Sequence, residues 1–475
     1  MLIGRPPATL PPTSSTTTAA PVTATTATTT TTATKTTALQ TTTAKLLTTT
    51  ALTPASAGRV GAGGTAFDMR LRAAALVSGL HHPAFEYGLD RSTGSVARAD
   101  NVVTPLFDGV VSFAERLRLI AGATSSIHLQ TFIFTNDDTG WNVARHLAER
   151  ARAGVEVRVM YDGLGSNRSG TEIFDFMRAA GVQVRARETG LDLLSVNDRW
   201  HEKHMVVDGK VAIEGGMNIA DEYSLGGSGL QLLRDNSARD AWRDVDVSVE
   251  GPAVHDVQRA FLRNWSVLGA PVAAADLAAL FPAPTKAPGG PAVRVVQHHP
   301  HGDQPDEHTQ QLHVRVVNAT SKRLLIENAY FLPSKQLRDA LVDAAKRGVT
   351  VQVMTNSKSS SDMGFVVDAS RYFYDELVDA GVQIFEKTGG TLHAKSLCAD
   401  GVYSIIGSVN LNGRSEGRDT ECAVGIRDEK TAAALEHRFT TGLAETKPVL
   451  AAELRTSSFM LDVKQWALST LAWTL

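Results

Sequence analysis

One short pattern occurs twice in this chain, and it constrains the fold more than any other feature. The first copy starts at His201 and reads HEKHMVVD, and the second starts at His393 and reads HAKSLCAD. In both copies lysine follows histidine by two positions, aspartate follows lysine by five, and asparagine follows aspartate by ten. The copies lie 192 positions apart from histidine through asparagine, so the chain contains two versions of one unit.

The residues around each copy predict a strand that presents a reactive pair. Apolar, β-prone residues flank both motifs, which favours strand over helix. Side chains alternate between the faces of a strand, so His201 and Lys203 point the same way. The Gly-Gly or Gly-Ser pair before each asparagine permits a tight turn with backbone amides close by. Two such sets facing each other suit a phosphodiester, which has charged oxygens to neutralise and two in-line positions to serve.

The duplication extends beyond the motifs to the surrounding pattern of strands and helices. Apolar spacing predicts helices that glycines end, and short buried strands that alternate with them. This alternation predicts an α/β fold with a largely parallel sheet in each repeat. The predicted helices are 107–121, 141–153, 173–180 and 337–347, and the predicted strands are 126–134, 155–161, 182–184, 324–331, 349–354 and 382–384.

Composition divides the chain into segments with different expected roles. The Thr-rich start cannot bury a core and is expected to be disordered. A Pro/Ala/Gly-rich stretch separates the two repeats. We expect a leader at 1–64, an extension at 65–105 with a helix near 71–80 and a loop-like stretch at 81–101, a first domain at 106–270, a linker at 271–291, a second domain at 292–445 and a helical tail at 446–475.

Charge and cysteine content exclude several classes of protein. The 475 residues carry a formal charge of only −3, so no basic field points to nucleic acid. Cys398 and Cys422 lie in apolar strand-like segments and are expected to be small buried residues, not a disulfide framework. No apolar run of about 18 residues predicts a transmembrane helix.

Both motifs resemble those of the phospholipase D superfamily, and the chain is most similar to the bacterial cardiolipin synthases within it. The resemblance covers roughly residues 100–445. It implies two homologous α/β repeats packed about a pseudo-twofold axis, with one shared active site. It further implies a phosphatidyltransferase that acts through a covalent phosphohistidine. The supporting segments are 215–223, 242–244, 328–333, 355–357 with Asp362, and 407–415.

The resemblance also implies roles for the two histidines and their acidic partners. By analogy with relatives, His201 is the nucleophile and His393 the general acid and base, although the near symmetry leaves this order open. Each imidazole needs an acceptor for its other nitrogen. Glu421 and Asp244 are the expected acceptors, with Asp246 as the fallback for the latter.

The remaining site residues are expected to hold the phosphoryl group or to complete the motif. Lysine suits phosphate as a compact point charge. The motif aspartates are grouped with the catalytic residues, although each precedes glycine and is expected to fix a turn. The catalytic motif thus comprises His201, Lys203, Asp208, His393, Lys395 and Asp400, and the phosphate-binding set comprises Asn218, Asn410 and Ser408. Arg414 and Ser415 resemble a supporting pair of the family.

Two departures from the family pattern lie near the second motif. Asn412-Gly413 and Asp419 stand where relatives usually have Asp-Pro and Asn, which bears on substrate fit. No cofactor is expected, and no metal, because the lysines supply the charge that a metal would. Histidines 298, 299, 301 and 308 are expected in a solvated loop over the site.

Three activities remain open at this point. A cardiolipin-synthase-like phosphatidyltransferase is preferred, a phospholipase D that releases phosphatidic acid is the alternative, and a nuclease is disfavoured by the charge. The expected partners are a phospholipid substrate and a peripheral membrane surface, with no nucleic acid, for a monomer. A bacterial location in the cytoplasm or at the inner membrane is expected, and secretion stays an alternative.

Overall fold

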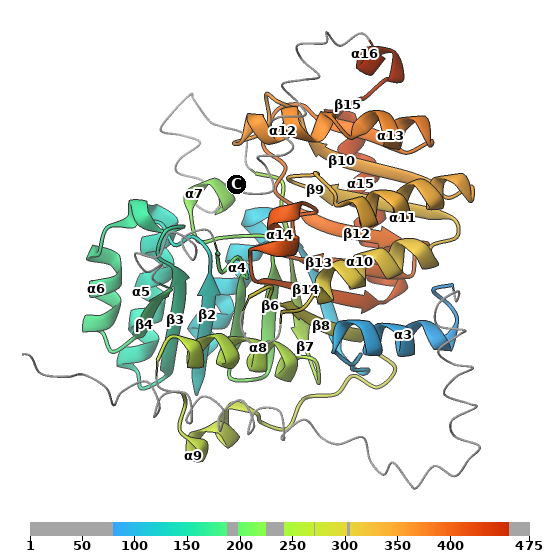
Figure 1. The fold of residues 1–475 in the computed structure, drawn as a ribbon. Coiled ribbons are helices and arrows are strands. Elements are labelled where there is room, and N and C mark those ends of the chain that lie inside the picture. Colours follow the sequence, from blue (N-terminus) through green and yellow to red (C-terminus); the bar gives the residue numbers. More distant parts are fainter. Residues whose placement is uncertain (1–78, 188–197, 225–241, 270, 302–304, 456–475) are drawn as a thin grey trace, which may run out of the picture.

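The computed structural model describes residues 79–187, 198–224, 242–269, 271–301 and 305–455 (Figure 1). The leader expected at 1–64, nearly all of the helix expected at 71–80, and the tail beyond residue 455 lie outside the described residues.

Two mixed sheets form the centre of the molecule, and the second repeats the first. Their orders are β1-β7-β6-β5-β2-β3-β4 and β8-β14-β13-β12-β9-β10-β11-β15, identical in plan except for the added last strand. The first sheet contains β1 (Val102–Phe107), β2 (Ser126–Thr131), β3 (Glu156–Asp162), β4 (Gln183–Arg187), β5 (His204–Val207), β6 (Val211–Gly215) and β7 (Val245–Glu250). The second contains β8 (Ala292–His298), β9 (Arg323–Asn328), β10 (Thr350–Asn356), β11 (Gln383–Lys387), β12 (Lys395–Ala399), β13 (Tyr403–Gly407), β14 (Glu421–Arg427) and β15 (Thr446–Pro448).

The prediction of largely parallel sheets is wrong. Only β2-β3-β4 and β9-β10-β11 pair in parallel, and these are the strands joined through helices. The motif strand β5 is antiparallel to β2 and β6, and β12 is antiparallel to β9 and β13. Each motif strand ends in an Asp-Gly turn, and so tight a connection can join only antiparallel neighbours.

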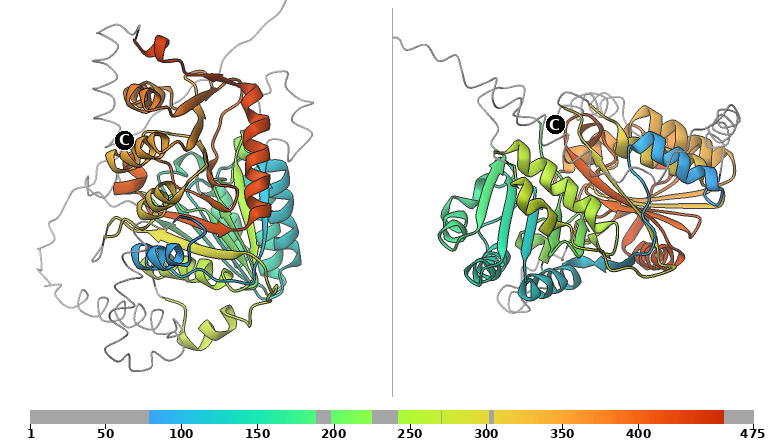
Figure 2. Two further views of the ribbon diagram at one scale, coloured as in Figure 1. Left: turned by 90° about the vertical axis from the view of Figure 1, so that its right-hand side faces the viewer. Right: turned by 90° about the horizontal axis from the view of Figure 1, so that it is seen from below.

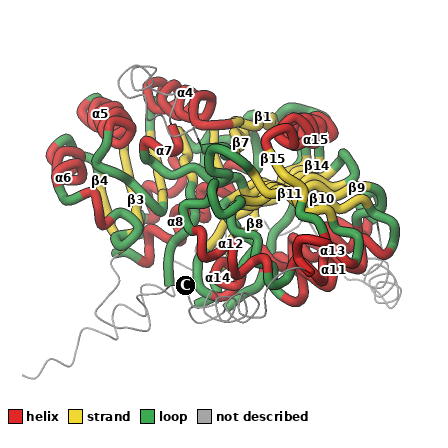
Figure 3. The backbone as a smooth tube through the Cα atoms, turned by 90° about the horizontal axis from the view of Figure 1, so that it is seen from above, coloured by secondary structure: helices red, strands yellow, loops and turns green. Residues whose placement is uncertain are grey.

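Helices cover the outer sides of the sheets, with the strands between them (Figure 3). The predicted helices of both repeats are confirmed. For example, the Asp137 carboxylate caps α5 by accepting from Gly140 N, and Gly154 follows its end at φ 90°. The longer helices are α4 (Asp108–Gly122), α5 (Asp138–Arg152), α6 (Glu172–Ala179), α8 (Val254–Val267), α10 (His308–Ala319), α11 (Lys335–Lys346), α12 (Gly364–Arg371), α13 (Tyr374–Asp379) and α15 (Glu429–Gly442). Four short helices are α7 (Asp221–Ser224), α9 (Ala274–Leu277), α14 (Gly413–Gly417) and α16 (Ala451–Arg455).

The two sheets pack against each other through a shared apolar core. Strands β13 and β14 lie against β6 and β7 (Figure 2). The buried side chains of this core include Val206, Val247 and Val424. Cys398 and Cys422 lie in the same core as free, buried thiols, as predicted. Because β6 and β13 are neighbours of the motif strands β5 and β12, this packing brings the two copies of the motif to one interface.

Several segments outside the repeats differ from expectation. Helix α3 (Pro83–Thr93) occupies the stretch expected to be loop-like, and it packs on the second repeat through Phe85 and Leu89. Strand β1 begins inside the expected extension, α9 lies inside the expected linker, and β15 lies inside the expected helical tail. None of the described helices combines the length and apolar character needed to span a bilayer.

Candidate active site

The two motif histidines line one pocket between the repeats. His201 and His393 are both buried, and the pocket that they line has a volume of about 540 Å³. Their lysines, Lys203 and Lys395, stand just before or at the start of β5 and β12. The fold thus places two imidazoles and two lysines close together, in the arrangement that the family resemblance implies.

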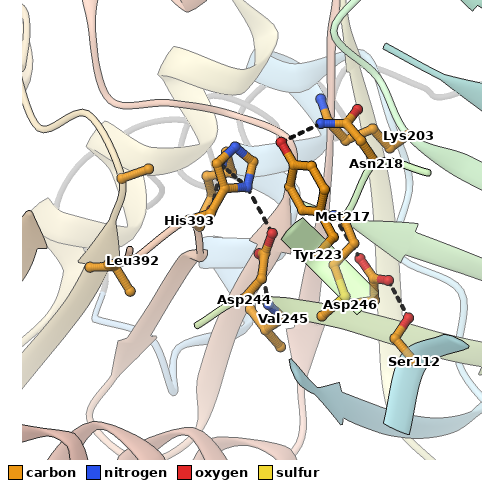
Figure 4. A network of polar contacts seen from close by, with 12 residues as sticks. Ser112, Lys203, Met217, Asn218, Tyr223, Asp244, Val245, Asp246, Leu392 and His393 are labelled. Carbon is orange, nitrogen blue, oxygen red and sulfur yellow. Dashed lines mark hydrogen bonds and ion pairs between the residues drawn. The ribbon is translucent and has the colours of Figure 1, made fainter. Parts of the chain in front are cut away.

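Each histidine is held by a carboxylate from the other repeat. The His201 Nδ1 atom lies 3.0 Å and 3.1 Å from the two carboxylate oxygens of Glu421. The His393 Nδ1 atom lies 2.7 Å from Asp244 Oδ2 (Figure 4). The backbone follows the same exchange, because His201 N donates to Thr420 O and His393 N donates to Arg243 O. The Nε2 atom of His201 is left for chemistry, whereas that of His393 lies 3.1 Å from Lys395 Nζ.

The two carboxylates are themselves fixed by further donors. Ser408 and Ser415 donate their hydroxyls to Glu421, the latter at 2.6 Å. Burial raises the pKa of Glu421, against the pull of the nearby lysines. Burial opposes the charge on Asp244 as well, but His393 and Lys395 bring its pKa below the ordinary value.

Asp246, the fallback partner for an imidazole, is committed elsewhere. Its carboxylate accepts from the Ser112 hydroxyl at 2.5 Å (Figure 4). It also pairs with Arg116 at 2.8 Å. It also accepts from Met217 N. These contacts anchor α4 to the turn after β6, so Asp244 is the residue that meets an imidazole.

The lysines are buried beside their own histidines. Each Nζ donates to the backbone carbonyl of the histidine two positions earlier, and Lys395 Nζ also lies 2.9 Å from His393 Nδ1. Burial lowers the pKa of Lys203 to about 8 and that of Lys395 to about 7. Burial and the two ammoniums also lower the pKa of both histidines. A phosphate anion would restore the lysine charge.

Both motif asparagines line the pocket, in unequal states. Asn218 is engaged, since its Nδ2 donates to the Tyr223 hydroxyl at 2.8 Å and its Oδ1 accepts from Ile133 N at 3.0 Å. The Oδ1 atom of Asn410 is buried and has no hydrogen-bond partner among the described residues. An orphaned amide oxygen beside the imidazoles is available to a substrate hydroxyl or to water.

Ser408 does not face the pocket, so its predicted contact with phosphate is wrong. Its side chain is fully buried behind Glu421, to which it donates, and it accepts from Cys422 N at 3.0 Å. The hydroxyl therefore positions a carboxylate and is too deep to meet a substrate oxygen.

The grouping of Asp208 and Asp400 with the catalytic residues is also wrong, whereas their expected role in a turn agrees with the structure. Each lies at the far end of its motif strand, with φ of 53° and 52°. The Asp208 carboxylate accepts from three consecutive amides at the start of β2, residues 124–126. Asp400 accepts equivalently from residues 321–323 before β9. Both clamp the motif hairpin to the neighbouring strand.

Only part of the histidine cluster that was expected in a solvated loop is exposed to solvent. His298 and His299 are buried, and His298 Nδ1 pairs with Asp306 at 3.1 Å. His301 and His308 are more exposed and pair with Asp198 and Asp306. In the described part of the chain, no group of three or more His, Cys, Asp or Glu side chains is placed to hold a metal ion.

The pocket walls contain residues that the motifs alone do not indicate. The Phe132 ring packs edge-on against His201 at 5.1 Å, and the Tyr223 ring against His393 at 5.0 Å. Arg199, Arg414 and Asp419 line the same pocket. The only signal for Arg199 in the sequence is its place two residues before His201, and nothing local indicates Phe132.

Comparison with known proteins agrees with this geometry. The family model described as "Cardiolipin synthase, PLD-like domain" matches residues 117–225 and 314–442, which are the two repeats. The chain is 30% identical over 345 residues to a cardiolipin synthase of Clostridium perfringens, covering 71% of this chain and 70% of that protein. It is 31% identical over 364 residues to a cardiolipin synthase of Listeria innocua, covering 75% and 72%.

A solved structure shows the same fold. The phosphatidylserine synthase of Haemophilus influenzae superposes with a TM-score of 0.62 at 14% sequence identity, covering 82% of this chain and 99% of that one. The duplicated motif, the paired sheets, the family match and these relatives agree. The chain is an enzyme of the phospholipase D superfamily, and it belongs to the family described as cardiolipin synthase, PLD-like domain.

Proposed function

We propose that the enzyme takes a phosphatidyl group from one phospholipid and transfers it to an alcohol, as a cardiolipin-synthase-like phosphatidyltransferase. The observation that carries this proposal is the pair of buried imidazoles, each held at Nδ1 by a carboxylate from the other repeat and lining one pocket. The relatives' name, cardiolipin synthase, supports the choice of a lipid phosphodiester.

The proposed reaction proceeds in two displacements. In the first, Nε2 of one histidine attacks phosphorus, while the other histidine, which binds a proton once the bound phosphate anion offsets the lysine charges, gives that proton to the departing headgroup oxygen. In the second, that same histidine takes the proton of the incoming hydroxyl, whose oxygen displaces the phosphohistidine. Lys203 and Lys395 neutralise the non-bridging oxygens throughout.

The surroundings of the two histidines favour His201 as the nucleophile. Burial, Lys203, Lys395 and Arg414 all act to lower the pKa of His201, whose Nδ1 atom faces Glu421. A nucleophile needs this free lone pair. Asp244 instead works to raise the pKa of His393, so a proton carried there is stabilised. His393 is therefore the better acid and base.

We further propose that the enzyme works as a monomer at a membrane surface. Leu164, which is 45% exposed, lines the pocket from the first repeat, and Met363 and Phe365 line it from the second. Acyl chains of a substrate whose phosphate lies between the histidines have to pass such residues. Apolar side chains there would contact the lipid interface.

A product assay on the full chain tests the proposal. Vesicles of phosphatidylglycerol, with and without phosphatidylethanolamine, are incubated with the enzyme and the lipids are separated. Cardiolipin is the expected product, whereas phosphatidic acid alone would assign the enzyme to the hydrolases. His201→Asn and His393→Asn serve as controls: both should lose turnover with the fold retained. At least a tenth of wild-type activity in both variants would contradict the two-histidine mechanism.

A further inference from the structure

Each side of the pocket has a motif lysine, and the two sides differ in the other charged residues. On the side of His201, the Phe132 ring lies 5.4 Å from Lys203 Nζ and 5.9 Å from the Arg199 guanidinium. Arg414 adds a further cation there, since it lowers the pKa of His201 after burial and the nearer charges. On the side of His393, the Tyr330 ring lies 6.3 Å from the imidazole, and the Tyr330 hydroxyl donates a hydrogen bond to Asp362.

Asp362 is an exposed carboxylate that lines the pocket. The Tyr330 hydroxyl donates to its two oxygens at 2.8 Å and 2.9 Å. Burial, with the charge of Asp362, raises the pKa of Tyr330 well above its ordinary value, so the phenol stays a donor. A phenol that donates to both oxygens fixes the carboxylate plane and leaves its outer lone pairs for other donors.

Three other acids at the site face a basic side chain, and Asp362 does not. Asp419 pairs with Arg414 at 3.0 Å, Glu421 with His201, and Asp244 with His393. Among the described residues, Asp362 forms no ion pair. A carboxylate that is held in place without a cation is suited to receive one, or a hydroxyl, from a ligand.

We propose that Asp362 selects the alcohol, by accepting a hydrogen bond from a second hydroxyl or an ammonium group on a small headgroup alcohol. This inference rests on the proposed function. In an in-line displacement, the leaving and entering alcohols occupy the side opposite the nucleophile. If His201 is the nucleophile, that side is the one of His393 and Asp362. A donor two carbons from the reacting oxygen reaches the carboxylate, and an anionic group is repelled.

Four two-carbon alcohols that differ only in their second group test this selection. Ethanolamine carries an ammonium, ethylene glycol a hydroxyl, ethanol a hydrogen and glycolate a carboxylate. Full-length enzyme receives phosphatidylglycerol vesicles with equimolar pairs of these acceptors, and the ratios of transfer products are measured. The wild type should favour ethanolamine over ethanol at least tenfold, with ethylene glycol between them and glycolate last.

Two variants separate selection from general damage. Asp362→Asn should reduce the ethanolamine-to-ethanol ratio at least tenfold and raise glycolate relative to ethanol. Asp339→Asn is the matched control, because this exposed aspartate lies on α11 and pairs with Lys335 outside the pocket. Its ratios should equal those of the wild type. A ratio in Asp362→Asn within twofold of the wild type overturns the proposal, whatever the total rate, because a merely structural role slows all acceptors alike.

Failure of the proposed function would look different. If the wild type only hydrolyses lipid, the same selection applies to the leaving group. Phosphatidylethanolamine should then be cleaved faster than phosphatidylethanol by the wild type and not by Asp362→Asn, and an unchanged ratio overturns the inference. No turnover of any lipid by the wild type refutes the proposed function, and the role of Asp362 with it.

Discussion

Replacing Asp244 with asparagine should disable His393 without unfolding the site. Asp244 is fully buried, its Oδ2 lies 2.7 Å from His393 Nδ1, and its Oδ1 accepts from Val245 N at 2.8 Å. The amide fits the same space but cannot stabilise an imidazolium, and its NH2 group favours the wrong tautomer. The equivalent change in a Ser-His-Asp triad lowers kcat about 10⁴-fold. We expect a loss of roughly 10³ to 10⁴-fold, or about 4 to 5.5 kcal/mol.

The choice of leaving group reveals which step of the reaction Asp244 supports through His393. If His393 is the general acid, a lipid whose headgroup is an acidic phenol needs no proton to depart. With that substrate, Asp244→Asn should release a rapid burst of phenol and then stall, because the second displacement still needs a base. Glu421→Gln affects the proposed nucleophile, His201, instead, so this variant should release no burst of phenol.

The assay is rapid-mixing phenol release, with intermediate trapping by acid quench on the same samples. Melting temperatures of both variants control for loss of fold. A burst in Glu421→Gln and none in Asp244→Asn would reverse the order of the histidines. Activity of Asp244→Asn within tenfold of the wild type on a natural lipid would refute the role of the carboxylate.

Three further outcomes are expected. Because burial lowers the pKa of Lys395 to about 7, kcat/KM should fall as the pH rises through 7. The unfolded chain binds this proton more tightly, so the same group should make the free energy of unfolding rise above pH 7. A pH series of rates and of urea melts checks both expectations. Asp208→Ala should lower the free energy of unfolding by about 2 to 3 kcal/mol in urea melts, with kcat retained. Burial opposes the charge of Asp208, but its backbone and side-chain donors outweigh burial and lower its pKa to about 2. Its contribution to stability is therefore present at neutral pH and is lost as the pH falls towards 2. Leu164→Glu should weaken vesicle binding about tenfold in a sedimentation assay, whereas Val267→Glu, at a site 61% exposed on α8, should not, and equal losses would contradict the assigned membrane face.

The repeat pattern and the identity of the main site residues could be predicted from the sequence. Two copies of a motif at constant spacing identify His201 and His393, because chance does not preserve four residue types over 18 positions twice. Apolar periodicity located the helices and strands of each repeat, because these elements bury one face or both. Those features depend on residue types and spacings within short segments, which can be read directly from the sequence.

What failed depends on contacts between distant segments. Sequence spacing places Glu421 after His393 in the same repeat, yet its carboxylate meets His201, and only the packing of the two sheets decides this. Ser408 looked like a pocket residue because it belongs to a glycine turn, but β14 covers it. Helix α3 was missed although Pro83 at its start and the cap from His82 are local signals, since its apolar face pairs with the second repeat.

Because each repeat supplies the carboxylate that orients the histidine of the other, catalysis requires both repeats together. Neither half carries both an imidazole and the acid that orients it, so a half that folds alone holds no working fraction of the enzyme. If the interface between the sheets opens, both histidines lose their acceptors in the same event. Under the proposed mechanism, a reactive phosphohistidine can therefore arise only where its partner is already in place, and a partly assembled molecule is inactive instead of cleaving lipids without control.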